Sequence, residues 1–267
     1  MDVPDLETIK EWMGEYFHEH AGEFATALGL ARAIRALRSS GRRAQGSRSE
    51  RARGPRSVVL INANGSAAAT ETMTELARRT LRPEDGFFVH GVTAADGPRP
   101  SGASVDPRAA VPQVLAAALR ARPDTTDAFV VSDFGDQAAT ELRAVLRVPV
   151  VGMGEAALLE ASSARFGVAA GTPGLAESIA ARIDALGLAS RCTGIRVAGD
   201  GAEALVPDPG ELRARWATAV TQCVDQDGAR TVIVAGGEVA EGAGESLAVP
   251  LICPVAAACR RVRSLLG

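Results

Sequence analysis

Short, continuous apolar runs alternate with longer amphipathic stretches along most of the chain. From residue 57 onward, runs such as VVLI at 58–61 are typical of strands buried on both faces of a parallel sheet. The stretches between them have apolar residues at helical spacing. We predict strands at 58–61, 87–93, 128–132, 166–170, 194–198 and 232–235, and helices at 70–81, 112–122, 175–186, 209–227 and 255–266. Strict alternation of this kind predicts an α/β fold with right-handed crossovers.

Part of this pattern occurs twice. The first copy is DAFVVSDFGD at 127–136, followed by VPVVGMGEAA at 148–157. The second is TVIVAGGEVA at 231–240, followed by VPLICPVAA at 249–257. Each copy contains an apolar strand, a turn of small or acidic residues, a helix-like spacer and a strand opened by Val-Pro. The repeat predicts two similar Rossmann-like lobes with parallel sheets, related by a pseudo-two-fold axis, with the chemistry where strand ends meet.

The pattern also divides the chain into segments. Residues 1–38 have apolar side chains at helical spacing and are predicted to form an N-terminal helical segment, docked either over the cleft mouth or across a dimer interface. Residues 39–56 are basic, polar and without periodicity, as in a flexible linker. We assign 57–160 and 249–267 to the first lobe and 161–248 to the second. The long Gly/Pro/Ser-rich loop at 94–106 is predicted to cover a site.

Composition narrows the function classes. The formal net charge is −3 and the isoelectric point is near 5.7, so nothing favours nucleic acid or an anionic membrane as partner. No apolar run is long enough for a membrane span, and the acidic start is unlike a secretory signal. The four cysteines lack metal-ligand spacing and are predicted to be buried small hydrophobes; they are Cys192, Cys223, Cys253 and Cys259. We expect a cytoplasmic homo-oligomer acting on a small molecule.

The first predicted strand ends in NANGS at 62–66, directly before a helix. Asn64, Gly65 and Ser66 offer amide, backbone N–H and hydroxyl donors at a helix N-terminus, which suits a carboxylate or another anion. The alternative is that Ser66 only caps the helix and the asparagines only shape the turn. Both interpretations stay open at this point.

Several blocks, in order, resemble the aspartate/glutamate/hydantoin racemase superfamily. INANGS at 61–66 is similar to that family's INPNTS, and GVTAADGP at 91–98 to its second substrate loop. VVSDFGD at 130–136 resembles a block usually written IACFGD, followed by PVVGMGEAA at 149–157 and FGV at 166–168. VAGGEV at 234–239 stands where the family has LGCAGM. The resemblance runs from about Arg56 to the C-terminus and implies the two-lobed racemase fold.

The departures from the family pattern bear on mechanism. The family uses two cysteines, one per lobe, on opposite faces of an acidic C–H. Here the first position falls on Asp133 and the second on Gly236, so the resemblance does not transfer a thiol mechanism. Asp133 is predicted to act as general acid or base. Glu238 is a second carboxylate in the opposite turn, and whether it faces Asp133 stays open. Either acid has a simpler alternative role at a helix start.

The resemblance also implies a substrate site around these turns. Gly236 is expected to leave room for a larger substrate, and backbone N–H groups near Gly135 and Gly237 to stabilise an oxyanion or enolate. His90 is expected to line the cleft. The full set of predicted binding residues is Asn62, Asn64, Gly65, Ser66, Thr93, Phe134, Gly135, Gly236 and Gly237. No cofactor is predicted, and no metal, because His18 and His20 do not share one helix face.

These features predict a cofactor-independent acid–base enzyme with a single catalytic carboxylate. Isomerisation, cyclisation, decarboxylation or dehydration of a small carboxylate or acidic-carbon compound is favoured, in specialised metabolism. One alternative is a racemase or epimerase that uses Asp133 and Glu238 as its two bases. The other is a non-catalytic homologue that binds a metabolite or a protein.

Overall fold

The computed structural model of the 267-residue chain describes residues 54–94, 111–121, 125–136, 138–199, 209–236 and 249–267. The predicted helical segment 1–38 and most of the predicted linker 39–56 and loop 94–106 lie outside these ranges. Gly237 and Glu238 lie outside them as well. Arg56, which we assigned to the linker, is the first residue of a strand, because its backbone N–H already pairs with Gly86 O.

Two four-stranded parallel sheets form the core of the described structure, in agreement with the predicted fold class. The first has the order β2-β1-β3-β4 and the second β6-β5-β7-β8, so both sheets have the same topology. All pairings are parallel. The strands are β1 (Arg56–Asn62), β2 (Phe87–Thr93), β3 (Ala128–Val131), β4 (Val150–Gly152), β5 (Phe166–Ala170), β6 (Cys192–Val197), β7 (Thr231–Ala235) and β8 (Leu251–Ile252).

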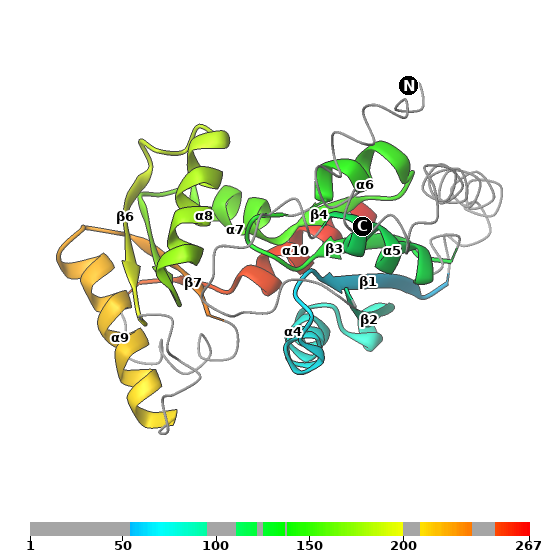
Figure 1. Ribbon diagram of the computed structural model, residues 1–267, viewed down its shortest axis with the longest axis horizontal. Coiled ribbons are helices and arrows are strands. Elements are labelled where there is room, and N and C mark those ends of the chain that lie inside the picture. The colour runs from blue at the N-terminus through cyan, green and yellow to red at the C-terminus, as the bar shows by residue number, and fades with distance from the viewer. Residues whose placement is uncertain (1–53, 95–110, 122–124, 137, 200–208, 237–248) are drawn as a thin grey trace, which may run out of the picture.

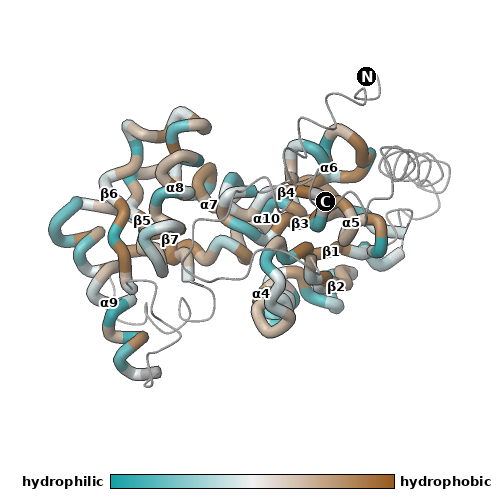
Figure 2. The backbone as a smooth tube through the Cα atoms, viewed as in Figure 1, coloured by the Kyte–Doolittle hydropathy of each residue, from teal (hydrophilic) through white to brown (hydrophobic). Residues whose placement is uncertain are grey.

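Helices cover both faces of each sheet. They are α4 (Ala67–Thr80), α5 (Val111–Arg120), α6 (Ala139–Val145), α7 (Met153–Ala161), α8 (Pro173–Ala185), α9 (Pro209–Asp225) and α10 (Pro254–Leu266), with a short 3-10 helix at Pro83–Asp85. Alternate residues of each central strand enter opposite layers: Val59 and Ile61 of β1 pack with α5, and Val58 and Leu60 with α4 and α10. In Figure 2 the sheet strands are largely brown, because both of their faces are buried.

The internal repeat extends to matching hydrogen bonds. In the first lobe Phe129 N donates to Pro149 O (2.9 Å), and in the second Val232 N donates to Pro250 O (3.1 Å). Each Val-Pro dipeptide therefore leads into the strand beside β3 or β7. Proline fits there because it stands at the start of a strand on the sheet edge, where no ladder N–H is lost.

The helices α7 and α10 run between the two lobes (Figure 1). Phe134 of the first lobe and Ala157 and Leu158 of α7 pack into the core of the second lobe with Phe166 and Ile233. Helix α10 packs instead on the first lobe, where Val255 and Val262 join the layer beneath β1 and β3. The lobes therefore share a packed interface built from these two helices.

One assignment made from the sequence is corrected. We gave residues 249–267 to the first lobe, but β8 pairs with β7 and completes the second sheet. Only α10 returns to the first lobe, because its apolar face packs on that lobe's sheet and on α4. No helix in the described ranges combines the length and the hydropathy that crossing a bilayer requires.

Candidate active site

The carboxyl ends of β1, β2 and β3 bring several predicted residues to one edge of the first sheet. Ser132 N donates to Ile61 O (2.8 Å), and Ala94 N donates to Asn62 O (2.9 Å). The turns that follow the three strands are thereby held side by side. Ligands of open α/β sheets bind outside this edge. The Asn64–Ser66 turn, Thr93 and Asp133 thus share one neighbourhood.

Asn62 organises the first turn. Its side chain is fully buried, and its Nδ2 donates to Asn64 Oδ1 (2.8 Å), Ser66 O (3.0 Å) and Thr70 Oγ1 (3.0 Å). Its Oδ1 accepts from Asn64 N (3.1 Å). Because both ends of the amide are used inside the protein, the predicted substrate contact of Asn62 is replaced by a structural role.

The turn nevertheless leaves donors for an anion. Ser66 caps α4, with its Oγ accepting from Ala69 N (3.2 Å), and Asn64 Oδ1 accepts from Ser66 N (3.0 Å). Within the described residues, the backbone N–H groups of Gly65, Ala67 and Ala68 have no acceptor. Three such groups at a helix N-terminus, together with the Ser66 hydroxyl hydrogen, form a favourable environment for negative charge.

The second turn contains Asp133 directly after β3. Asp133 is partly exposed, and its carbonyl oxygen accepts from Asp136 N (3.1 Å), which closes the turn. Gly154, in the first turn of α7, approaches this turn so closely that a Cβ there would collide with Phe134 O. The backbone that presents Asp133 is therefore packed against the start of α7 and has little freedom to shift.

Asp136 holds this arrangement and was not among the residues selected from the sequence. Its side chain is 1% exposed, and its two carboxylate oxygens accept from Gly154 N (2.9 Å) and Glu155 N (2.8 Å) at the N-terminus of α7. Its backbone is left-handed, with φ 53°. The one available signal was its place as the last residue of the SDFGD block, and a cap formed by a residue so far from its helix in sequence is invisible to local pattern analysis.

Arg182 joins the second lobe to the same carboxylate. This residue of α8 donates from Nε to Asp136 Oδ2 (3.0 Å), and its guanidinium also lies 3.3 Å from Glu155 Oε2. Burial raises the pKa of the Asp136 carboxyl to about 6, against the opposing effects of the Arg182 charge and the two backbone N–H groups. The turn that presents Asp133 is thus anchored on both lobes.

Of three other predicted residues, Thr93 lies at the edge of the site, whereas Phe134 and His90 do not. Phe134, expected at the substrate, is 3% exposed and belongs to the hydrophobic core that joins the lobes, because its backbone turn points the ring inward. Thr93 ends β2 at the site edge, and its hydroxyl is 2.7 Å from Thr70 Oγ1. His90 is exposed in the middle of the edge strand β2, three residues before that end. The structure does not bring His90 to the site.

The turn after β7 has the place in the second sheet that the Asp133 turn has in the first, and it is tightly packed. Gly236 directly follows β7, and a Cβ built on it would collide with the indole ring of Trp216 from α9. Trp216 is 3% exposed and belongs to the core between α9 and the second sheet. The expectation that Gly236 leaves room for a larger substrate is therefore corrected: the indole fills the volume that a side chain at position 236 needs. Gly135 is half-buried in the Asp133 turn.

The cysteines are distributed through the cores. Cys223 and Cys259 are buried, and burial raises their thiol pKa values to about 11 and about 12, respectively. Cys192 is half-buried, and burial raises its thiol pKa as well. Cys253 is the half-buried N-cap residue of α10. Two of the four thus match the prediction of buried thiols fully, and the other two in part.

The sequence profile of the Asp/Glu/Hydantoin racemase family matches residues 58–262, which includes both sheets. The chain belongs to this family. A hydantoin racemase of Paenarthrobacter aurescens is 28% identical over 216 residues, which cover 79% of this chain and 91% of that protein. A hydantoin racemase of a Pseudomonas strain is 26% identical over 205 residues, or 75% and 82% of the two chains.

Solved structures agree with the two-lobed fold. An allantoin racemase from Klebsiella pneumoniae superposes with a TM-score of 0.72 at 25% identity, covering 79% of this chain and 87% of that one. An unliganded arylmalonate decarboxylase shares the fold with a TM-score of 0.57 at 16% identity, covering 79% and 93%. In the part of the chain that the structure describes, no three His, Cys, Asp or Glu side chains converge as metal ligands would.

Proposed function

We propose that this chain is a cofactor-independent acid–base enzyme in which Asp133 transfers a proton on one face of an acidic carbon. One observation supports this most strongly: the turn after β3 has a partly exposed carboxylate, whereas the equivalent position after β7 is a glycine closed by Trp216. Two-base racemisation needs a competent group on each face of the carbon. Among the described residues, an evident group of this kind is present in one of the two turns only.

The substrate class follows from the other turn. The free N–H groups at the start of α4 suit a carboxylate or the polarised carbonyl of a ring ureide. The named activities of the relatives, hydantoin racemase and allantoin racemase, support testing five-membered ureides first. A small carboxylate with an acidic C–H is the second class to test.

The proton balance defines the possible outcomes. In an isomerisation, the Asp133 carboxylate removes a proton from carbon and the resulting acid returns it to another atom of the enolate. In a decarboxylation, CO₂ leaves, the electron pair of the C–C bond stays on the substrate carbon, and protonated Asp133 supplies the proton. Either path requires one group that changes protonation state, and backbone N–H groups that stabilise the enolate oxygen lower its barrier.

A second candidate is a racemase that pairs Asp133 with Glu238. The names of the curated relatives favour it. Glu238 lies outside the described residues, so this candidate depends on experiment. A third, a binding homologue without catalysis, predicts no exchange at any substrate carbon.

The decisive measurement is deuterium uptake from D₂O, followed by NMR on separate enantiomers of 5-substituted hydantoins, allantoin and small arylated or alkylated malonates. We expect exchange or product formation at one face, above a buffer blank and abolished in Asp133→Asn. Interconversion of both enantiomers would instead identify a two-base racemase. A panel without exchange or product would contradict acid–base chemistry and favour a binding homologue.

A further inference from the structure

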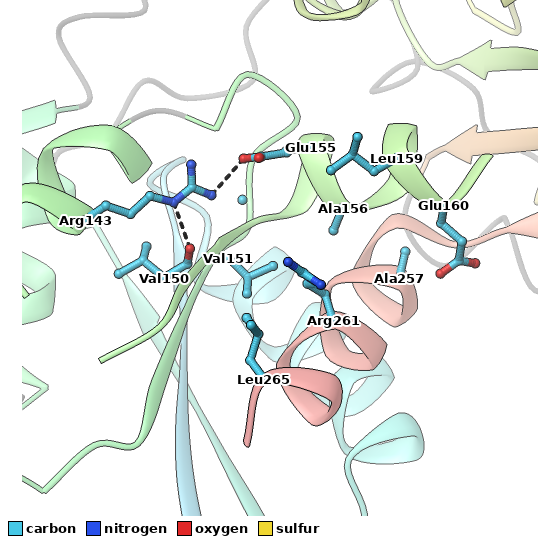
Figure 3. A pocket seen from close by; sticks show the side chains of 11 residues that line it. Arg143, Val150, Val151, Glu155, Ala156, Leu159, Glu160, Ala257, Arg261 and Leu265 are labelled. Carbon is cyan, nitrogen blue, oxygen red and sulfur yellow. Dashed lines mark hydrogen bonds and ion pairs between the residues drawn. The ribbon is translucent and has the colours of Figure 1, made fainter. Parts of the chain in front are cut away.

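A hollow of about 520 Å³ lies between the strand β4 and the helices α7 and α10. Figure 3 shows Glu155 and Leu159 of α7 on one side of it and Arg261 and Leu265 of α10 on another. Its remaining lining residues are Arg143, Val150, Val151, Gly152, Ala156, Glu160 and Ala257. We call this hollow the flank groove.

The flank groove exposes unusual apolar surface. Leu159 is 48% exposed and Leu265 is 44% exposed, and they are two of the four large hydrophobic side chains that stand out from the described surface. The other two, Phe88 and Val197, lie on the strands β2 and β6. The two exposed leucines give this hollow a partly apolar border, to which apolar side chains of another segment can pack.

The charges of the flank groove are mostly satisfied, with one exception. Arg143 donates to Val150 O (2.9 Å) and to Glu155 Oε2 (2.7 Å), and Glu160 is paired with Arg260. Among the residues that the structure describes, the Arg261 side chain forms no ion pair or hydrogen bond. An occupant with apolar and acidic side chains would therefore suit the groove.

The N-terminal part of the chain joins the fold next to this groove. Ser57 N donates to Asp127 Oδ2 (2.8 Å), and Asp127 N donates to Ser57 O (2.8 Å). Asp127 lines a second hollow, and Leu265 lines both that hollow and the flank groove. The two hollows thus share Leu265 as a lining residue, and the second of them lies where residue 57 enters the sheet.

The sequence before residue 57 has the matching chemistry. Seven acidic residues and one lysine stand between residues 1 and 24, and the apolar residues recur at helical spacing: Ile9, Trp12, Met13, Tyr16, Phe17 and Phe24. By random-coil statistics, a chain with the length of 39–55 spans roughly 20–25 Å. Two strand spacings, from β1 to β4, amount to about 10 Å. The connection is long enough to reach.

We propose that residues 5–24 dock as an amphipathic helix in the flank groove of the same chain, with the apolar face on Leu159 and Leu265 and the acidic face near Arg261. Tethering gives such a segment an effective concentration of about millimolar, so a modest interface suffices to keep it bound. Docking in the flank groove does not involve the Asp133 side chain and does not depend on which reaction the enzyme catalyses.

Hydrogen–deuterium exchange of the full-length protein, read by mass spectrometry, tests this. Peptides covering residues 5–24 should be protected in the wild type, equally at low and high protein concentration. The double variant Leu159→Asp/Leu265→Asp should raise their exchange rate at least ~10-fold, since it places charge on the apolar contact and repels the acidic segment. Phe88→Asp, at an equally exposed hydrophobic on β2, is the matched control and should change nothing there.

Two further measurements separate docking from other causes. Peptides from β1 and β5 report whether the double variant still folds, and Arg261→Glu, a substitution of an exposed residue, should reproduce the effect more weakly. Protection of 5–24 that persists in both variants overturns the proposal. Protection that depends on protein concentration also overturns it. A third contradicting result is a variant that loses oligomer mass in light scattering but keeps the protection of 5–24, because the groove would then hold a second copy of the chain.

Discussion

The turn after β3 and the turn after β7 occupy equivalent places in two lobes of identical topology, yet they have diverged in opposite directions. The first presents the Asp133 carboxylate on a backbone held by Asp136 and Gly154. The second contains Gly236, whose missing side chain is compensated by the Trp216 ring. The two sheets share one topology, and the difference shows that the same scaffold accommodates unlike residues at equivalent strand ends.

The comparison also separates two kinds of surroundings for a position without a side chain. A small residue alone would leave a cavity that water or a larger substrate enters. Here a large ring from a neighbouring helix fills that space, and it belongs to a close-packed core. Reversal therefore needs two substitutions, one at each residue, rather than one.

The largest expected effect concerns the first turn. Asp133→Asn keeps the shape of the side chain and removes its proton transfer, so turnover should fall by ~10²- to 10⁴-fold, the usual contribution of general acid–base catalysis. Steady-state kinetics or solvent deuterium exchange on a responding substrate measures this. The control is Asp184→Asn at an exposed site on α8. Near-normal turnover in Asp133→Asn would show that Asp133 is not catalytic, and that the turns after β3 and β7 do not differ in catalytic function.

The anchor of that turn should respond to pH. Because burial raises the pKa of Asp136 from its usual 3.8 to about 6, the folded state binds more protons than the unfolded state between these values. The carboxyl therefore favours folding most at low pH, and this contribution is lost as pH rises through about 6. Relative to Asp136→Asn, the wild type should lose up to about 3 kcal/mol of unfolding free energy between pH 4 and pH 7.

Urea denaturation at several pH values checks this, with both proteins in the same buffers. A stability difference that is flat, or that grows in favour of the wild type with rising pH, would mean that Arg182 and the α7 backbone offset the cost of burying the charge. The two lobes would then be joined more strongly at neutral pH than the raised pKa indicates.

The closed turn can be tested by refilling it. Gly236→Cys should destabilise the protein by about 1–3 kcal/mol, because the new side chain collides with Trp216. Gly174→Cys is the control, since a Cβ there meets nothing within 4 Å. In a double-mutant cycle, Trp216→Ala with Gly236→Cys should be at least ~1 kcal/mol more stable than the sum of the single changes. Simple additivity would show that the ring does not occupy this volume.

The smallest effect belongs to the anion turn. Ser66→Ala removes the cap of α4 and should cost about 1 kcal/mol of unfolding free energy. If Ser66 also donates to the substrate, KM should rise several-fold while kcat changes little. Ser178→Ala, an exposed hydroxyl on α8, controls for loss of a serine in a helix. A change in stability without a change in KM would show that Ser66 caps α4 and does not bind the substrate.

The predictability of these regions differs for physical reasons. Buried strands such as β5 and β7 can be predicted from short apolar runs, and the fold class and the internal repeat follow from these strands. The neighbourhood of Asn64 and Asp133 follows from parallel strands ending at one sheet edge. The contact of Trp216 with Gly236 joins residues of α9 and of the turn after β7, and no local pattern encodes which side chain of a helix meets a given strand end.

Two further errors have similar origins. Phe134 was expected at the substrate because its neighbours are, but the turn directs its ring into the core between the lobes. Asp136 was passed over because its partners, Gly154 and Arg182, are separated from it by 18 and 46 positions. Hydrogen bonds over such separations depend on how helices are placed in space, which periodicity does not report.

The path of α10 has a consequence for the order of assembly during synthesis. This helix covers one face of the first sheet and contacts α4, although it follows the whole second sheet in the sequence. One face of the first sheet therefore emerges early and stays uncovered until α10 is made; its residues are Val58, Leu60, Ala128 and Val130. The first lobe cannot complete its fold as it is made, and a nascent chain stalled before residue 254 presents an open apolar layer to chaperones.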